Sequence, residues 1–99
     1  MNEEKLINAC GNGILKEVQA LLESLPTDIN WQDDNRWTPL MWASVNGHLD
    51  VVRYLICNGA DVNIKNNNGE TALDLAEKNG CEEVAEFLRI AGARHGHEI

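Results

Sequence analysis

The sequence repeats itself with a period of 33 residues, and this repeat constrains the fold more than any other feature. When residues 35–60 are aligned with residues 68–93, ten of the 26 positions are identical, including the pair Thr38 and Thr71. A fixed period of this length is typical of stacked supersecondary units that share one elongated core. Because stacked units enclose no deep cavity, we expect such a chain to work through its surface.

A fainter copy of the unit precedes these two. Four small or apolar residues lie 34 positions before their counterparts in the next unit: Ala9, Gly13, Val18 and Leu21. The Asp-Ile-Asn segment at residues 28–30 lies 33 positions before the Asp-Val-Asn segment at residues 61–63. The chain therefore contains three units, of which the first is degenerate.

These units define the expected domain organisation. A single repeat domain is predicted over residues 1–94, followed by a tail over residues 95–99. The unit boundaries are predicted at about residues 2–32, 33–65 and 66–94. Three units are about the fewest that form a stable array, so we expect a complete but marginally stable fold with polar terminal faces.

Charge and composition argue against several classes of function. The formal net charge is −8, with acidic residues spread along the chain, so nucleic-acid phosphates would be repelled. The apolar runs are too short to span a bilayer, and the acidic segment Met-Asn-Glu-Glu-Lys at residues 1–5 does not resemble a secretion signal. We therefore expect a cytoplasmic or nuclear protein that binds neither nucleic acid nor membrane. A basic or complementary protein surface suits this charge better.

The chemically reactive residues form no recognisable catalytic set. The odd number of cysteines, without a Cys-x-x-Cys spacing, indicates a reducing compartment rather than a disulfide or zinc framework. His95 and His97 lack a third ligand in the sequence, so we expect a frayed tail there instead of a metal site. The sequence predicts no enzyme, no cofactor, no bound metal and no small-molecule substrate.

The middle unit shows how the repeat folds. Thr38 is a suitable N-cap and Pro39 a suitable first residue for a helix, which Gly47 would end in the left-handed conformation. A second helix with one apolar face follows, and an asparagine-rich turn at residues 66–69 comes after it. Neither helix is able to bury its apolar face alone. The predicted fold class is all-α, a solenoid of stacked helix-turn-helix units joined by β-hairpin-like loops.

These residues resemble the ankyrin repeat family. The middle unit carries the family's Thr-Pro-Leu core within residues 37–43, its Gly-His turn at residues 47–48 and its Gly-Ala-Asp-Val-Asn segment at residues 59–63. The resemblance covers about residues 4–93 and implies an ankyrin-repeat solenoid.

Three residues depart from the family pattern. Met41 and Asp74 stand where the family usually has a histidine that bridges neighbouring loops. Arg36 stands at the position of the hairpin glycine. If Arg36 adopts a positive φ there, the cost is about 1 kcal/mol, because its Cβ crowds the backbone.

The resemblance implies protein binding through the groove formed by the hairpin tips and the first helices. Transferred by position, it predicts these protein-binding residues: Asn12, Asp34, Asn35, Trp37, Val45, Asn46, Asn67, Asn68, Glu70, Lys78 and Asn79. Trp37 and Val45 would be the apolar anchors, and the Asn and Asp tips would supply hydrogen bonds. We expect a monomeric adaptor or inhibitory subunit that binds another protein.

The three tryptophans are expected to play different roles. Trp37 lies beside the hairpin turn, where it suits either partner binding or packing on its own hairpin. Trp42 is expected in the core, because its period-mate is Leu75, although its mate in the first unit is Asn8. Trp31 is expected to cover the junction between the first two units.

Two alternative functions remain open. Apolar residues at the ends of the array would support self-association, with Leu6, Ile14 and Leu15 at one end and Phe87 and Ile90 at the other.

The second alternative concerns Asn63, which follows Leu55 by eight residues and Asp61-Val62 directly. This spacing resembles the ankyrin segments modified by an asparaginyl hydroxylase. Hydrogen bonding within the hairpin explains the same asparagine equally well.

Overall fold

The computed structural model describes residues 2–24 and 26–99, so Met1 and Leu25 lie outside the described residues. Within these ranges the chain forms α-helices and one short 3-10 helix, without strands, which confirms the all-α prediction. The elements are α1 (Asn2–Asn12), α2 (Leu15–Ser24), α3 (Pro39–Val45), α4 (Leu49–Cys57), α5 (Ala72–Lys78), α6 (Glu82–Ile90) and the 3-10 helix Gly96–Glu98.

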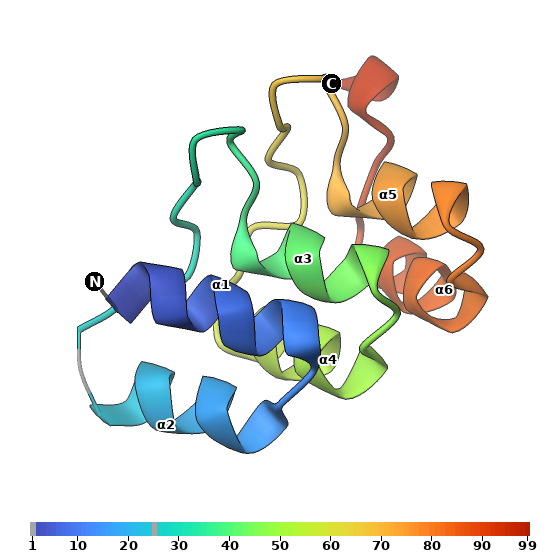
Figure 1. Ribbon diagram of the computed structural model, residues 1–99. Coiled ribbons are helices and arrows are strands. Elements are labelled where there is room, and N and C mark those ends of the chain that lie inside the picture. The colour runs from blue at the N-terminus through green and yellow to red at the C-terminus, as the bar shows by residue number, and fades with distance from the viewer. Residues whose placement is uncertain (1, 25) are drawn as a thin grey trace.

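The helices form two rows. Figure 1 shows α1, α3 and α5 stacked in an inner row, with α2, α4 and α6 in an outer row below them in this view. Each inner helix packs on the outer helix of its own unit, and α3 also packs on both α1 and α5. The long loops that join the units project to one side of the inner row. Within the described residues, no helix is both long and apolar enough to cross a lipid bilayer.

The inner helices begin at threonine caps, as the sequence predicts. The Thr38 hydroxyl accepts a hydrogen bond from the Met41 backbone N–H at 3.2 Å, and Pro39 occupies the first turn. In the third unit, Thr71 and Asp74 cap each other reciprocally, with the Thr71 N–H 2.9 Å from the Asp74 carboxylate. Such a cap contributes about 1 kcal/mol to helix stability. Asp74 therefore anchors its own helix at a position where the family usually has histidine.

One core runs through all the units. Its largest fully buried side chains include Leu6, Leu40, Met41, Leu55, Leu73 and Leu88. Met41 is 1% exposed, so here the residue that replaces the family's histidine fills the core. The expectation that Leu6 is exposed at the first cap is wrong, because this side chain is completely buried. Ile14 and Ile90, by contrast, are exposed as expected.

The projecting loops of the second and third units share one internal hydrogen-bond pattern. The Asp33 carboxylate accepts backbone N–H groups of Asn35 and Trp37 at 3.0 and 2.9 Å. In the next loop, 33 residues later, an asparagine side chain accepts the two equivalent N–H groups. Arg36 has a φ of 64°, close to the 74° of Gly69 at the matching position. The turn therefore keeps its type, and Arg36 adopts the conformation that favours glycine.

Side-chain amides connect one loop to the next. The Asn30 side-chain oxygen accepts the Asp61 N–H at 2.9 Å, and the Asn63 side-chain oxygen accepts the Arg94 N–H at 2.9 Å. These equivalent bonds repeat along the array and fix the spacing of the loops.

The C-terminal segment differs from the expected frayed tail. The Thr71 hydroxyl donates to the Arg94 carbonyl at 2.7 Å, and the Gly96 N–H donates to the Asp74 carboxylate at 2.7 Å. Gly96 is buried against the third unit. The segment therefore packs on the third loop and on the start of α5, because the capping residues of α5 hold it there.

Candidate functional site

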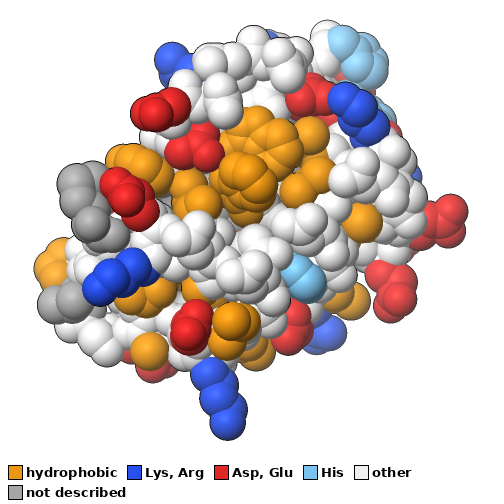
Figure 2. Space-filling model, in the orientation of Figure 1, with side chains coloured by type: hydrophobic (Ala, Val, Ile, Leu, Met, Phe, Trp, Pro, Cys, Tyr) orange, Lys and Arg blue, Asp and Glu red, His pale blue; other side chains and the backbone are white. Residues whose placement is uncertain are grey.

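A concave groove lies between the projecting loops and the inner helices. We define it by loop residues 33–37 and 66–70 together with the exposed sides of α1, α3 and α5. Figure 2 shows hydrophobic side chains gathered at the centre of this face, with acidic side chains beside them. An apolar centre with a charged rim is the usual anatomy of a protein interface.

The centre of the groove is a pair of tryptophans. The rings of Trp37 and Trp42 lie with their centroids 4.6 Å apart, tilted by 41°. The Trp42 indole N–H donates to the Asp33 carboxylate at 3.1 Å, and the same carboxylate accepts the Trp37 backbone N–H. Both tryptophans are half-buried. Asp33 thus fixes the position of both rings while part of their surface faces solvent.

The prediction that Trp42 belongs to the core is wrong. Its period-mate Leu75 is 3% exposed, but Trp42 is half-buried and reaches across the groove to the loop. The exposed Asn8, its counterpart in the first unit, was the sequence signal for this location. The indole is accommodated here because its ring packs on Trp37 while its N–H donates to Asp33.

Two hollows lie along α1, at the end of the groove formed by the first two units. The larger, about 460 Å³, is lined by Glu4, Ile7, Asn8, Trp31, Asp33, Asp34 and Asn35. The smaller, about 190 Å³, is lined by Ile7, Asn8, Gly11, Asn12, Trp42 and Asn46. Among the described residues, the lining of these hollows contains three carboxylates and no lysine or arginine. This end of the groove is therefore acidic.

The residues in and near these hollows include some that the sequence predicted and some that it did not. Trp31 is half-buried between α1 and the loop of the second unit, at the junction where it was expected. Asn12, a predicted binding residue, is exposed at the end of α1. Glu4, Ile7 and Asn8 were not predicted, because the first unit lacks the motifs that locate such positions.

The predicted tip residues are brought together at the ends of the loops. Asp34, Asn35, Asn67 and Asn68 are all exposed there. The Asn67 N–H donates to the Asn35 carbonyl at 3.1 Å, which links the two neighbouring tips. Their side chains line one edge of the groove at a fixed spacing.

Asn46 and Asn79 lie at the other edge, and their side chains already have partners within the fold. The Asn46 side-chain N–H donates to the Gly11 carbonyl at 3.0 Å, and the Asn79 side-chain N–H donates to the Val45 carbonyl at 3.0 Å. Each bond joins a unit to the one before it. These two predicted binding residues therefore hold the stack together, whatever they also offer a partner. Val45 itself is half-buried against the core at the end of α3.

The third unit's part of the groove is nearly neutral. Glu70 and Lys78 form an ion pair at 3.3 Å. The Asn66 amide donates to Glu70 at 3.1 Å, and this bond, together with Lys78, lowers the pKa of the Glu70 carboxyl despite its partial burial. Because the charge of Glu70 is balanced by Lys78, the acidic character of the groove is concentrated at the first two units.

Asn63 lies outside the groove, at the base of the loops. Its side-chain oxygen accepts the Arg94 N–H, and its backbone N–H donates to Asp61 at 2.9 Å. An enzyme acting on this side chain would have to open those hydrogen bonds first. Hydroxylation of Asn63 stays a prediction.

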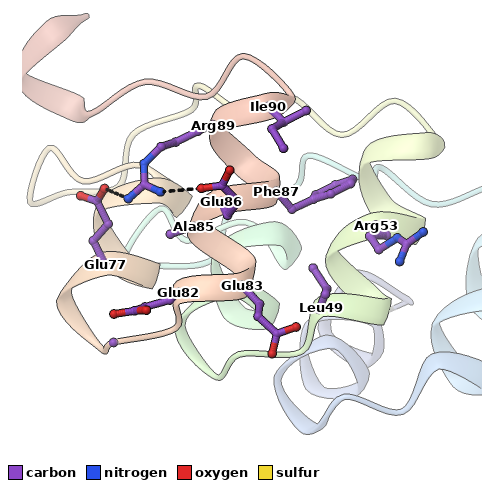
Figure 3. Close-up of a pocket in the computed structure, with 11 residues that line it drawn as sticks. Leu49, Arg53, Glu77, Glu82, Glu83, Ala85, Glu86, Phe87, Arg89 and Ile90 are labelled. Carbon is purple, nitrogen blue, oxygen red and sulfur yellow. Dashed lines mark hydrogen bonds and ion pairs between the residues drawn. The ribbon is translucent and has the colours of Figure 1, made fainter.

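A third hollow, of about 650 Å³, lies on the outer side between α4 and α6. Figure 3 shows Phe87 pointing across it towards Arg53, whose guanidinium carbon is 5.9 Å from the ring centroid. Arg89 points to the other side of α6, where it pairs with Glu77 at 2.7 Å. Ile90 is 76% exposed at the rim of the hollow. This is the largest exposure among the big apolar side chains that the structure describes.

Comparison with known proteins identifies relatives of the repeat units. A family model described as ankyrin repeats in three copies matches residues 6–98. The human NAD-capped RNA hydrolase NUDT12 is 34% identical over 83 residues, which are 84% of this chain and 18% of that protein. The Bos taurus ankyrin repeat domain-containing protein 49 is 49% identical over 57 residues, 58% of this chain and 24% of that protein.

One solved structure is similar over nearly the whole length of this chain. It is the complex of a predatory endopeptidase from Bdellovibrio bacteriovorus with an immunity protein. The matching chain has a TM-score of 0.87 and 42% sequence identity, over 90% of this chain and 46% of that chain. The chain thus spans less than half of the length of each of these relatives.

Proposed function

Because this chain belongs to the ankyrin repeat family, we propose that it is a non-enzymatic module that binds a partner protein in its concave groove. The observation that carries the proposal is the pair Trp37 and Trp42, fixed by Asp33 and half exposed at the groove's centre. Large aromatic side chains in such positions are typical anchors of protein interfaces. The hydrogen-bonded loops are already ordered, so binding loses little conformational entropy.

The partner presents a basic segment to the groove. Glu4, Asp33 and Asp34 line the hollow beside the tryptophans, and the net charge of −8 attracts cations over a longer range. A lysine or arginine of the partner would gain both carboxylate contacts and a cation–π contact with an indole ring. Binding should therefore weaken as the salt concentration rises.

An inhibitory role is favoured over an adaptor role by one observation. A chain similar to this one over 90% of its length occurs in a complex between an endopeptidase and an immunity protein. A rigid groove that binds a segment of a partner is able to block the partner's own functional site. We propose no catalysis for this chain, since the hydrolase NUDT12 is matched over only 18% of its length.

The test is an affinity capture from cell extract with two groove variants. Asp34→Lys reverses an exposed charge at the loop tip, and Asn8→Arg, at an exposed position of α1, fills the hollows along that helix. Glu17→Lys makes the same charge change as Asp34→Lys at an exposed position of α2, in the outer row. Circular dichroism would establish that all variants are folded.

A protein retained by the wild type and by Glu17→Lys, and lost by both groove variants, would be purified and titrated against the wild type. Direct binding that weakens with salt would support the proposal. Equal retention by all variants would place the binding surface elsewhere and contradict it.

Self-association is a second candidate, favoured by the exposure of Ile90 beside the hollow between α4 and α6. A dimer formed there would bury Ile90, Phe87 and Leu49. Light scattering at increasing concentration is the measurement. A mass that rises for the wild type and stays monomeric for Ile90→Lys would support it, and a constant monomer mass for the wild type would rule it out.

A further inference from the structure

The C-terminal segment brings two histidines and a glutamate together. His95, His97 and Glu98 each offer one ligand atom, and these atoms all lie within 4.8 Å of one another. The Nδ1 atom of His95 is 2.9 Å from Oε1 of Glu98, and the two imidazole rings stack with centroids 5.5 Å apart. The sequence showed only the two histidines, and the 3-10 helix brings Glu98 close enough to be a third ligand.

The backbone between the two histidines is fixed to the third unit. Gly96 is buried, and its N–H donates to the Asp74 carboxylate. A Cβ atom on Gly96 would collide with the backbone carbonyl of Gly69, so only glycine fits there. The histidines on either side are therefore presented by an ordered segment, which reduces the entropy lost when their side chains gather around a ligand.

His95 already has the outer partner that a metal-bound histidine needs. Its Nε2 atom lies 2.7 Å from Oε1 of Glu77, and the other oxygen of Glu77 accepts a hydrogen bond from Arg89 at 2.7 Å. Metal-bound histidines generally donate their second ring N–H to a carboxylate, which fixes the ring's orientation. This arrangement leaves Nδ1 of His95 directed at Glu98.

The spacing of the donor atoms fits one ion. Zinc binds imidazole nitrogen and carboxylate oxygen at about 2.0–2.2 Å, so two donors at the tetrahedral angle lie about 3.3–3.6 Å apart. The 2.9 Å between His95 and Glu98 is a few tenths of an ångström shorter, and a small movement of the exposed Glu98 side chain would make room for the ion. His97 is exposed, so its side chain is free to move closer. The nearby carboxylates of Asp74 and Glu77 favour a cation at this place.

We propose that His95, His97 and Glu98 form a binding site for a divalent transition-metal ion of the zinc type, with Glu77 as the positioning residue for His95. Two imidazoles and one carboxylate suit zinc and its neighbours better than magnesium or calcium, which prefer all-oxygen ligands. Three protein ligands leave one position of a tetrahedral site open to water or to a donor from another molecule.

Calorimetric titration of the full chain with Zn²⁺ tests the site. The wild type should bind one Zn²⁺ per chain, and His97→Ala and Glu98→Gln should each weaken binding about tenfold or more. His48→Gln is the control, since His48 precedes α4 and contacts the Gly11 carbonyl in the last turn of α1, away from the segment. Absence of saturable binding by the wild type, or unchanged binding by His97→Ala, would overturn the proposal.

The role of Glu77 needs its own pair of variants, because Glu77 also pairs with Arg89. Glu77→Gln should weaken Zn²⁺ binding about 10–100-fold and change the visible spectrum of the Co²⁺ form, because the imidazole loses its oriented carboxylate. Arg89→Gln breaks the ion pair with Glu77 but leaves the contact between Glu77 and His95, and should bind Zn²⁺ as the wild type does. Equal losses in the two variants would assign Glu77 a purely structural role.

Discussion

The indole N–H of Trp42 donates to the carboxylate of Asp33 at 3.1 Å, and this bond connects α3 to the projecting loop of residues 33–37. The other oxygen of this carboxylate holds the loop itself through the backbone N–H groups of Asn35 and Trp37. One side chain therefore sets both the shape of the loop and the position of the tryptophan pair.

Asp33→Ala should accordingly destabilise the fold and release Trp42. Losing three hydrogen bonds from a partly buried carboxylate should lower the free energy of unfolding by about 1–3 kcal/mol. Urea unfolding gives the stability, and tryptophan fluorescence of the native state reports the indole environment. The control is Asp34→Ala at the exposed neighbouring position, which should change the stability by less than about 0.5 kcal/mol. Equal effects of the two variants would contradict this account.

Asn46→Ala should weaken the attachment of the second unit to the first. Its amide donates to the Gly11 and Trp42 carbonyls at 3.0 and 3.2 Å, so the expected loss of stability is about 0.5–1.5 kcal/mol. Asn12→Ala, at an exposed position without a hydrogen bond to another described side chain, should have almost no effect. Urea denaturation at equilibrium compares the two variants. A loss no larger for Asn46→Ala than for Asn12→Ala would show that the inter-unit bond contributes nothing measurable.

Much of the fold follows from the 33-residue period, because each unit repeats the same caps, turns and apolar face. Thr38, Pro39 and Gly47 mark the boundaries of the helices that the structure contains. Features that depend on contacts between units were harder to predict. Leu6 was placed on the surface because the first unit lacks a neighbour before it, yet α1 buries that side chain against α2 and α3.

The candidate groove was predicted only in part. Trp42 was assigned to the core because its counterpart in the third unit, Leu75, is apolar. Its counterpart in the first unit, the polar Asn8, pointed to the surface but received less weight. The C-terminal segment was expected to fray because it is a chain end whose two histidines lack a third ligand in the sequence. Its order comes from Asp74, whose carboxylate holds Gly96 as well as Thr71. Such tertiary partners leave no periodic trace in the sequence.

Arg36 offers a route to a more stable chain. Its φ of 64° is strained for a residue with a Cβ atom, so Arg36→Gly should raise the free energy of unfolding by up to about 1 kcal/mol. Gly69 has the matching conformation one unit later, with open space around its would-be Cβ atom. Gly69→Ala should therefore lower stability by a similar amount. Thermal unfolding of the pair measures both changes, and shifts in the same direction would contradict the argument.

The cysteines should differ sharply in reactivity. Burial raises the pKa of the Cys10 thiol to about 12, so almost no thiolate forms at neutral pH, whereas Cys57 is exposed on the surface. Since the thiolate is the nucleophile, iodoacetamide should modify Cys57 in the folded protein and reach Cys10 only after unfolding. Peptide mass spectrometry with and without urea gives the two rates. Comparable labelling of both residues in the folded state would show that α1 opens readily.

The stability should depend on pH through Asp74. Partial burial alone would raise the pKa of this carboxyl, but the backbone N–H groups of Thr71 and Gly96 donate to it, and its pKa falls below the usual 3.8. A carboxyl whose pKa is lower in the folded state stabilises the fold above its unfolded pKa. That contribution is lost as the pH falls through the lower, folded value.

Asp74→Asn isolates this contribution, because the amide oxygen still accepts a hydrogen bond but carries no charge. The wild type should be the more stable protein at pH 6, and its advantage should shrink steadily as the pH falls below 3.8. Urea unfolding of both proteins across this pH range is the measurement. A difference that stays constant down to pH 2 would mean that Asp74 stabilises the segment through its shape and hydrogen bonds alone, without any contribution from its charge.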